Sequence, residues 1–251
     1  PCFYGVDGTF HDPDFACQHP DLIAAGNWHA LALFASREFQ DQLAACGLLI
    51  DIGSTTTDLI PLSRAGVMTK SRTDFDRLAE GSLVYLGAGR TPVCALVDRL
   101  PYSGRHVPIM REVFATIDDA RLLLKIASPD GQDCASADGK PRDRFHARNR
   151  LARMIGLDHR TVDESAAGEM AAAIHQSCRV VLQQSLEKLL HRYSLPDDFT
   201  LIVSGHGKDL IPGTLLSGRQ TIFLDQNLSG ALSRTGTANA VAKLLENEKG
   251  G

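Results

Sequence analysis

The chain has 251 residues, of which 43% are hydrophobic and 22% charged, and its formal net charge is -4. These values are ordinary for a globular protein and allow a substantial buried core. The negative charge argues against a broad nucleic-acid-binding face. No apolar run reaches the ~18 residues that a membrane-spanning helix needs. We therefore expect neither a nucleic acid nor a membrane as a partner.

The six cysteines are scattered along the chain and form no CxxC pair. This spacing favours neither a disulfide framework nor a structural zinc site, so we interpret them as reduced thiols. The opening segment PCFYGVDGTF does not have the basic-then-apolar layout of a signal peptide. Both observations indicate a cytoplasmic protein.

The first half of the chain alternates between loop, helix and strand patterns. The first 25 residues are rich in Asp, His, Pro and Gly and are predicted as loop. A helical pattern follows over residues 24–47, with Gly47 as its expected end. Short apolar runs then predict a strand over residues 47–53 and two more within residues 57–74. The three strands follow one another directly, which predicts an antiparallel meander.

The second half begins with a predicted helix over residues 75–86 and an irregular region over about 87–163, rich in Pro, Gly and Asp. We interpret this region as an insertion. The remaining predicted elements are a long helix over 163–193 capped by Asp163 or Ser165, strands over 199–205 and 220–225, and a closing helix over 235–248.

This order predicts an α/β fold, a ribonuclease-H-like mixed sheet flanked by helices with an inserted irregular and helical region. The sheet would occupy residues 48–251, with the insertion at about 87–163. Ligands of such sheets bind where strands end and loops converge. Two glycine-containing segments, DIGSTTTD and SGHGKDL, come directly after predicted strands. We expect the ligand site there.

The segment DIGSTTTD has the residues of a phosphate-binding loop. Gly53 allows a tight turn and a close approach to a ligand. The amides and hydroxyls of Ser54, Thr55 and Thr56 can then surround phosphate oxygens. Asp51, at the strand end, is a candidate Mg²⁺ ligand and catalytic residue, because magnesium prefers carboxylate and phosphate oxygens. A plain hairpin turn with threonines at strand edges is the alternative.

The segment LIVSGHGKDL is a strand followed by Gly205 and Gly207 and a potential helix start. Such a turn can offer amides to an anion. Taken alone, the two glycines are equally compatible with an ordinary turn. Their position after DIGSTTTD favours a second phosphate-binding turn.

Several arginines are candidate phosphate ligands. Arg150 and Arg153 are three residues apart on one predicted helix face, and guanidinium groups bind phosphate oxygens in pairs. Arg90 and Thr91 precede Pro92, which favours an extended backbone at Thr91. For Arg150 and Arg153, burial in the core is as good an explanation as phosphate binding. For Arg90 and Thr91, a structural turn is an equally good explanation. Arg142 and Arg144 are interpreted as a solvated face.

Other polar residues give weaker signals. Asp118 and Asp119 are adjacent, but a helix separates neighbours by about 100°, so they need not share a site. His175 and Cys178 are interpreted as core or surface residues rather than metal ligands. Neither a GxSxG nor an HExxH motif is present.

The two glycine-containing segments, in this order, resemble the superfamily of acetate and sugar kinases, heat-shock chaperones and actin. The resemblance implies an actin-like ATPase fold, in which two ribonuclease-H-like lobes enclose a phosphorylated ligand. Asp51, Gly53, Thr55 and Thr56 match its second-lobe phosphate loop. Gly205 and Gly207 match the glycine-rich turn near the nucleoside, which makes ATP a possible ligand.

Longer blocks narrow the resemblance. AAGNWHALA, LLIDIGSTTTDLIPL, TDFDRLAEGSLVYLGAGRTPVCAL, EVFATIDDA, SADGKPRDRFHARNRLARM and TANAVAKLL are similar to the hydantoinase/oxoprolinase-related proteins of tetrahydromethanopterin-linked C1 transfer. Members of this group begin with another DxGG loop and a first lobe. We expect this first lobe to be absent here. Residues 1–47 would then be a remnant linker and a helix that connect to the missing lobe. The segment GVDGTFHD is not expected to replace its DxGG loop.

The resemblance implies a synthase of methanofuran biosynthesis. Archaeal members join an aminomethyl-furanylmethyl diphosphate to the phenol of γ-glutamyltyramine, or here a related acceptor, and release diphosphate. The implied partners are this small-molecule diphosphate and a phenolic amine acceptor, with Mg²⁺ as cofactor. A homo-oligomer is compatible with the sequence.

In this reaction Arg90, Arg150 or Arg153 would complete a charge clamp for the diphosphate, and Asp58 or Asp138 would act as the base for the phenol. Two other hypotheses remain open. One is an ATP-dependent kinase or hydantoinase/oxoprolinase-like ATPase of the same fold. The other is a non-catalytic regulatory or assembly partner that keeps a phosphate-binding pocket.

Overall fold

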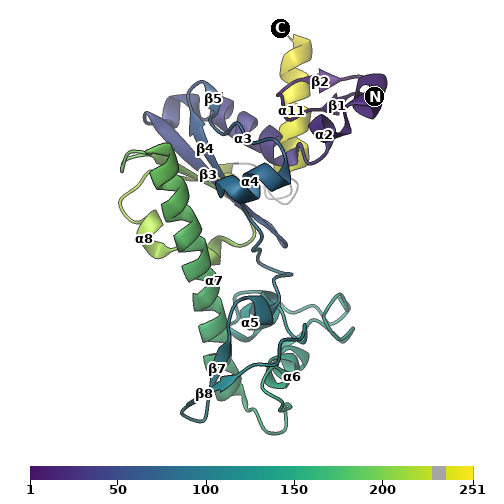
Figure 1. Cartoon of the computed structure of the whole chain (residues 1–251), viewed down its shortest axis with the longest axis vertical. Coiled ribbons are helices and arrows are strands. Elements are labelled where there is room, and N and C mark those ends of the chain that lie inside the picture. The colour runs from purple at the N-terminus through teal and green to yellow at the C-terminus, as the bar shows by residue number, and fades with distance from the viewer. Residues whose placement is uncertain (228–235, 251) are drawn as a thin grey trace.

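The computed structural model describes residues 1–227 and 236–250. Within these residues the centre is a six-stranded mixed sheet in the order β10-β9-β3-β4-β5, with β6 paired to β4 (Figure 1). The mixed α/β fold is therefore confirmed. The strands are β3 (Cys46–Ile52), β4 (Thr57–Ser63), β5 (Gly66–Val67), β6 (Leu83–Val84), β9 (Thr200–Gly205) and β10 (Thr221–Phe223).

The pairing of β3 brings the two glycine-containing segments together. β3 runs antiparallel to β4, with Asp51 opposite Asp58, and parallel to β9, with Asp51 beside Ser204. β5 pairs antiparallel to β4, which confirms the predicted meander, and β10 pairs parallel to β9. Because parallel strands end at the same edge of a sheet, the segments after β3 and β9 are neighbours.

Helices cover both faces of the sheet, as its alternating side chains require. Leu48, Ile50 and Ile52 point to a core shared with α7 (Glu164–Tyr193). Leu49 points to the other core, which α3 (Asn27–Glu38) and α11 (Gly236–Gly250) close. Figure 1 shows α3 and α11 beside the sheet and α7 extending away from it. The side chain of Asp163 caps α7, so the first of the two predicted caps is the correct one.

The lower part of α7 carries a second group of elements, called the small lobe here (Figure 1). It contains the hairpin of β7 (Arg99–Tyr102) and β8 (Arg105–Pro108), with helices α5 (Ile117–Leu123) and α6 (Arg144–Arg153). β7, α5 and α6 all contact α7, and α5 also contacts α6. The small lobe is built from the segment that the sequence predicts as an insertion.

Shorter elements complete the described residues. In the described part of the chain, no helix is both long and apolar enough to cross a membrane. These elements are β1 (Phe3–Tyr4), β2 (Phe10–His11), α1 (Pro13–Gln18), α2 (Pro20–Ile23), η1 (Gln40–Gln42), α4 (Asp74–Glu80), η2 (Val93–Ala95), η3 (Lys208–Leu210), α8 (Gly213–Leu216) and α9 (Leu224–Asn227).

Three sequence predictions of secondary structure were wrong. Residues 1–25 are not all loop, since β1 and β2 form a hairpin and two short helices follow. Gly47 does not end a helix: it lies inside β3, where a Cβ would be 2.7 Å from Leu43 Cδ2 and 3.1 Å from the carbonyl oxygen of Thr200. The helix predicted to Leu86 ends at Gly81, whose φ of 96° is left-handed, and β6 follows.

Candidate functional site

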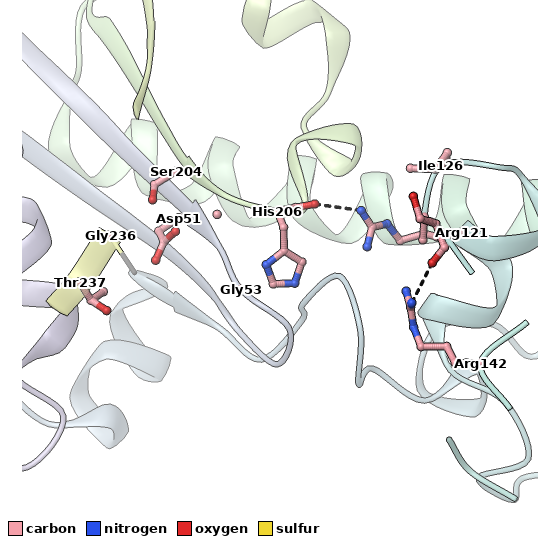
Figure 2. Close-up of a pocket in the computed structure, with 12 residues that line it drawn as sticks. Asp51, Gly53, Arg121, Ile126, Arg142, Ser204, His206, Gly236 and Thr237 are labelled. Carbon is pink, nitrogen blue, oxygen red and sulfur yellow. Dashed lines mark hydrogen bonds between the residues drawn. The ribbon is translucent and has the colours of Figure 1, made fainter. Parts of the chain in front are cut away.

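A cavity of about 700 Å³ opens at the carboxyl ends of β3 and β9, and is called the first cavity here (Figure 2). Side chains from the sheet, from α11 and from the small lobe meet around it. Asp51 and Ser204 lie together on one side, beside Thr237, while Arg121 and Arg142 approach from the small lobe. Its lining residues are Asp51, Gly53, Arg121, Ile126, Ala127, Ser128, Arg142, Ser204, Gly205, His206, Gly236 and Thr237.

A second cavity of about 490 Å³ adjoins the first, since Arg121, Arg142 and His206 line both. Ser54 and Arg90 form the side of this second cavity that belongs to the sheet. Ala88, Gly89 and His206 also line it, and the small lobe contributes the rest, including Asp118, Asp119, Asp133 and Arg150. The two cavities together form a polar space between the sheet edge and the small lobe.

Asp51 is the predicted carboxylate that lines the first cavity. Burial and the neighbouring Asp58 raise the pKa of Asp51 to about 6, although a hydrogen bond from Ser204 opposes this. The carboxylate therefore changes charge close to neutral pH. Such a group can bind a cation or exchange a proton, which is typical of functional sites.

The loop from Gly53 to Thr56 is hydrogen-bonded to a turn at residues 88–90. The Gly53 amide donates to the Thr56 carbonyl at 3.0 Å, and the Ala88 amide donates to the Gly53 carbonyl at 2.8 Å. The amides of Gly89 and Arg90 both donate to the Ser54 carbonyl. Gly53 lines the first cavity and Ser54 the second, whereas Thr55 and Thr56 are half-buried and line neither.

Arg90 lies on the turn over this loop, with an exposed side chain that lines the second cavity beside Ser54. Thr91 is buried, and its hydroxyl accepts from the Gly87 amide at 2.9 Å and donates to the Gly87 carbonyl at 3.1 Å. The structure thus gives Arg90 access to a ligand and gives Thr91 a role in closing the turn. Phosphate binding by either residue stays a prediction.

Gly205 and Gly207 pack directly against the end of β3. Gly205 has a φ of +82°, and a Cβ on it would be 2.2 Å from the Ile52 carbonyl oxygen. A Cβ on Gly207 would be 2.2 Å from Ile52 Cγ2. The amides of His206 and Gly207 donate to the Ile52 carbonyl at 3.0 and 3.3 Å. Close packing therefore explains both glycines, and phosphate binding by this turn stays a prediction.

Asp58 is held in an ion pair beneath the site. Arg77, which is only 2% exposed, donates to the Asp58 carboxylate at 2.5 Å and to the Ser82 carbonyl at 3.2 Å. The Arg77 guanidinium also lies 4.0 Å from the centre of the Trp28 ring. Burial raises the pKa of Asp58, although Arg77 opposes this. Asp58 lines neither cavity, so its predicted role as a base has no support from its position.

Asp138 and Arg150 are also paired with each other. The Arg150 guanidinium is fully buried and donates to Asp119 at 2.8 Å and to Asp138 at 3.0 Å. Arg153 is 45% exposed on its side chain and lies 3.6 Å from Asp138. Arg142, predicted as part of a solvated face, instead binds Asp118. Asp118 and Asp119 thus have separate partners, as a helix allows.

These observations can be compared with known proteins. A sequence model of the hydantoinase/oxoprolinase family matches residues 2–245. The chain belongs to the hydantoinase/oxoprolinase family.

Two curated relatives of this family member carry the same name, (4-{4-[2-(gamma-L-glutamylamino)ethyl]phenoxymethyl}furan-2-yl)methanamine synthase. The protein from Methanocaldococcus jannaschii is 28% identical over 245 residues, which cover 98% of this chain and 72% of the relative. The protein from Methanococcus vannielii is 26% identical over 168 residues, which cover 67% of this chain and 74% of the relative. The chain is therefore similar to synthases along nearly its whole length.

Among solved structures, this family member is similar to a nucleotide-free acetone carboxylase described in connection with ATP-dependent acetone carboxylation. The match has a TM-score of 0.48 and 14% identity, and covers 78% of this chain and 29% of the carboxylase chain.

Several residues of this family member's site were missed by the sequence analysis. Ser204 could have been found, because it directly precedes Gly205 at the end of a predicted strand, and the structure pairs it with Asp51. Arg121 and Asp209 gave no signal, because an arginine in a helix and an aspartate in a turn are common. His175, interpreted as a core or surface residue rather than a metal ligand, is half-buried, and its Nε2 lies 2.9 Å from the Asp209 carboxylate.

Proposed function

We propose that this chain belongs to a transferase that joins an aminomethyl-furanylmethyl diphosphate to the phenol of γ-glutamyltyramine, or of a related acceptor, and releases diphosphate. The reaction would serve methanofuran biosynthesis in tetrahydromethanopterin-linked C1 transfer. The observation that carries the proposal is the 28% identity over 98% of the chain to a synthase whose name describes such a phenoxymethyl-furan ether.

The geometry of the site supports this reaction class. The bond between the furanylmethyl carbon and the diphosphate oxygen breaks, and the electron pair leaves with the diphosphate. The furan stabilises positive charge on the methylene carbon, and the phenol oxygen then forms the new C–O bond as its O–H bond breaks and the proton passes to a carboxylate or to the released diphosphate. The protein must mainly position two substrates and stabilise the departing charge. A polar space shared by two adjoining cavities suits two substrates.

Arg90 and Ser54 are proposed to bind the diphosphate. They lie next to each other on the wall of the second cavity, and the Arg90 amide holds the Ser54 carbonyl at 2.7 Å. An exposed guanidinium can reorient to form paired hydrogen bonds with phosphate oxygens. Gly53 and Thr56 keep the loop closed beneath them.

Asp51 fits a magnesium ion. Magnesium usually takes one or two protein carboxylates and completes its shell with water and substrate phosphates. Asp51, with the Ser204 hydroxyl beside it, offers such a partial shell. The described residues contain no group of three or more His, Cys, Asp or Glu that could hold a metal ion. A bound magnesium ion would supply positive charge for the departing diphosphate.

A second role is open to the same carboxylate. At neutral pH Asp51 is largely ionised, so one of its oxygens can accept the phenolic proton. The two roles differ in their dependence on metal. Activity that requires Mg²⁺ supports the ligand role, and activity that persists in EDTA supports the role of proton acceptor.

The finer fold assignment also belongs to this proposal. We propose a ribonuclease-H-like lobe of the actin-like ATPase type. The antiparallel order β3-β4-β5 followed by the parallel strands β9 and β10 supports it. Binding of ATP at the glycine-rich turn is a separate proposal within that fold.

The test uses the full natural protein, a synthetic aminomethyl-furanylmethyl diphosphate, γ-glutamyltyramine and Mg²⁺. Mass spectrometry should detect the ether product, with one diphosphate released for each ether formed. A parallel reaction with ATP in place of the furan substrate measures nucleotide hydrolysis. ATP turnover without an ether product would overturn the proposal in favour of the ATPase alternative.

A further inference from the structure

Arg121 is a buried arginine that connects the small lobe to the sheet edge. It lies on α5, and its side chain is 8% exposed. Its guanidinium donates to the Ala88 carbonyl at 2.8 Å and to the His206 carbonyl at 2.9 Å. It also binds both carboxylate oxygens of Asp209, at 2.7 and 3.1 Å. One side chain thus bonds three separate positions outside its own helix.

The two carbonyls that Arg121 binds belong to the turns that hold the end of β3. The Ala88 amide donates to the Gly53 carbonyl, and the His206 amide donates to the Ile52 carbonyl. In each turn, therefore, the amide of one residue donates to the backbone that follows Asp51, and the carbonyl of the same residue accepts from Arg121. Figure 2 shows the bond between the Arg121 guanidinium and the His206 carbonyl. Movement of the guanidinium would release both turns together.

Asp209 fixes the orientation of this guanidinium. It accepts two hydrogen bonds from Arg121 and a third from His175, a residue of α7. Burial acts in the opposite direction, but the hydrogen bonds from His175 and Arg121 lower the pKa of Asp209 to about 2. The carboxylate is therefore ionised throughout the neutral range. A planar guanidinium held at both edges cannot be replaced by the single ammonium group of lysine.

We infer that Arg121 is a positioning residue that holds the turns at Ala88 and His206 against the loop after Asp51. Through these turns the small lobe sets the geometry of the loop that faces both cavities. The effect on catalysis rests on the proposed function, whereas the effect on the turns can be measured without it.

The test is amide hydrogen exchange in the full natural protein and in Arg121→Lys, resolved at residues 88–90 and 206–207. In the variant these amides should exchange at least about tenfold faster. The guanidinium hydrogen bonds are missing there, so local opening of the turns no longer has to break them and costs less free energy. The amides of the β3–β4 ladder should keep their wild-type protection. Wild-type exchange at both turns would overturn the inference.

Arg142→Lys is the matched control, because Arg142 also lines both cavities but binds Asp118 and the Ser128 carbonyl within the small lobe. In Arg142→Lys the amides at 88–90 and 206–207 should exchange as in the wild type. Faster exchange there would contradict a specific role for Arg121. If Arg121→Lys loses protection throughout the sheet, Asp209→Asn decides. Faster exchange at 206–207 then supports the inference, and wild-type exchange overturns it.

A kinetic measurement separates this inference from the proposed function. In the synthase assay, Arg121→Lys should lower kcat/KM for the diphosphate at least about tenfold while leaving KM for the phenolic acceptor nearly unchanged. Unchanged kinetics with loosened turns would refute a catalytic effect of the positioning. If the wild type forms no ether, the proposed function fails, and hydrogen exchange still decides whether Arg121 holds the turns.

Discussion

Asp51 and Asp58 lie directly opposite each other on β3 and β4, yet only Asp58 has a buried arginine as its partner. Arg77 neutralises Asp58, and Asp51 lines the first cavity with a pKa raised to about 6 by burial and by Asp58. Two facing carboxylates thus have different surroundings. Asp58 is held in an ion pair, and Asp51 faces the first cavity.

The first prediction concerns pH. Asp51 must be ionised to bind a cation or to accept a proton, so kcat/KM should fall as the pH drops below about 6. The same raised pKa means that the contribution of Asp51 to stability is present below its ordinary value of 3.8 and is lost as pH rises through about 6. Activity should therefore rise over the range in which this contribution declines. A pH-rate profile without a limb near 6 would contradict the assignment.

Arg77→Ala should destabilise the protein by about 3–5 kcal/mol, because it leaves the Asp58 carboxylate buried without a partner. The stacking of Arg77 on Trp28 is lost as well. Urea unfolding measures the change. Arg111→Ala is the matched control, since Arg111 and Asp98 form an ion pair with side chains 84% and 85% exposed. That change should cost under about 1 kcal/mol.

The sequence predicted which segments meet but not how their charges pair. The segments DIGSTTTD and SGHGKDL were expected at strand ends, and the parallel pairing of β3 with β9 places them side by side. The ion pairs could not be predicted, because Arg121 and Asp209 are 88 residues apart and meet only through tertiary packing. The helix predicted to Leu86 failed because Gly81 adopts a left-handed conformation that ends it.

Arg150 and Arg153 should differ sharply, although the sequence made both candidates for phosphate binding with burial as an equal alternative. Arg150→Ala should cost about 3–5 kcal/mol of folding stability, because it leaves the buried Asp119 carboxylate without its guanidinium partner. Arg153→Ala should cost under about 1 kcal/mol, because its side chain is half exposed and its ion pair is long. Thermal unfolding compares the two. Equal losses would show that the ion pair of Arg150 is not the stabilising interaction inferred here.

Arg90→Ala should act on the substrate rather than on the fold. Its side chain is exposed, so the melting temperature should stay within about 1 °C of the wild type. Loss of a guanidinium contact to the diphosphate should raise KM for that substrate by about 10- to 100-fold. Steady-state kinetics with each substrate varied in turn measures the change. An altered KM for the phenolic acceptor alone would assign Arg90 to the other substrate.

The most direct test of the account compares ether formation by Asp51→Asn and Asp58→Asn, followed by mass spectrometry at equal concentrations of folded protein. Both changes replace a carboxylate by an amide of nearly the same size, at facing positions of the same two strands. Asp51→Asn should lower the rate by about 10²-fold or more, while Asp58→Asn should keep it within a few-fold. Equal losses in the two folded variants, or no ether from the wild type, would contradict the account.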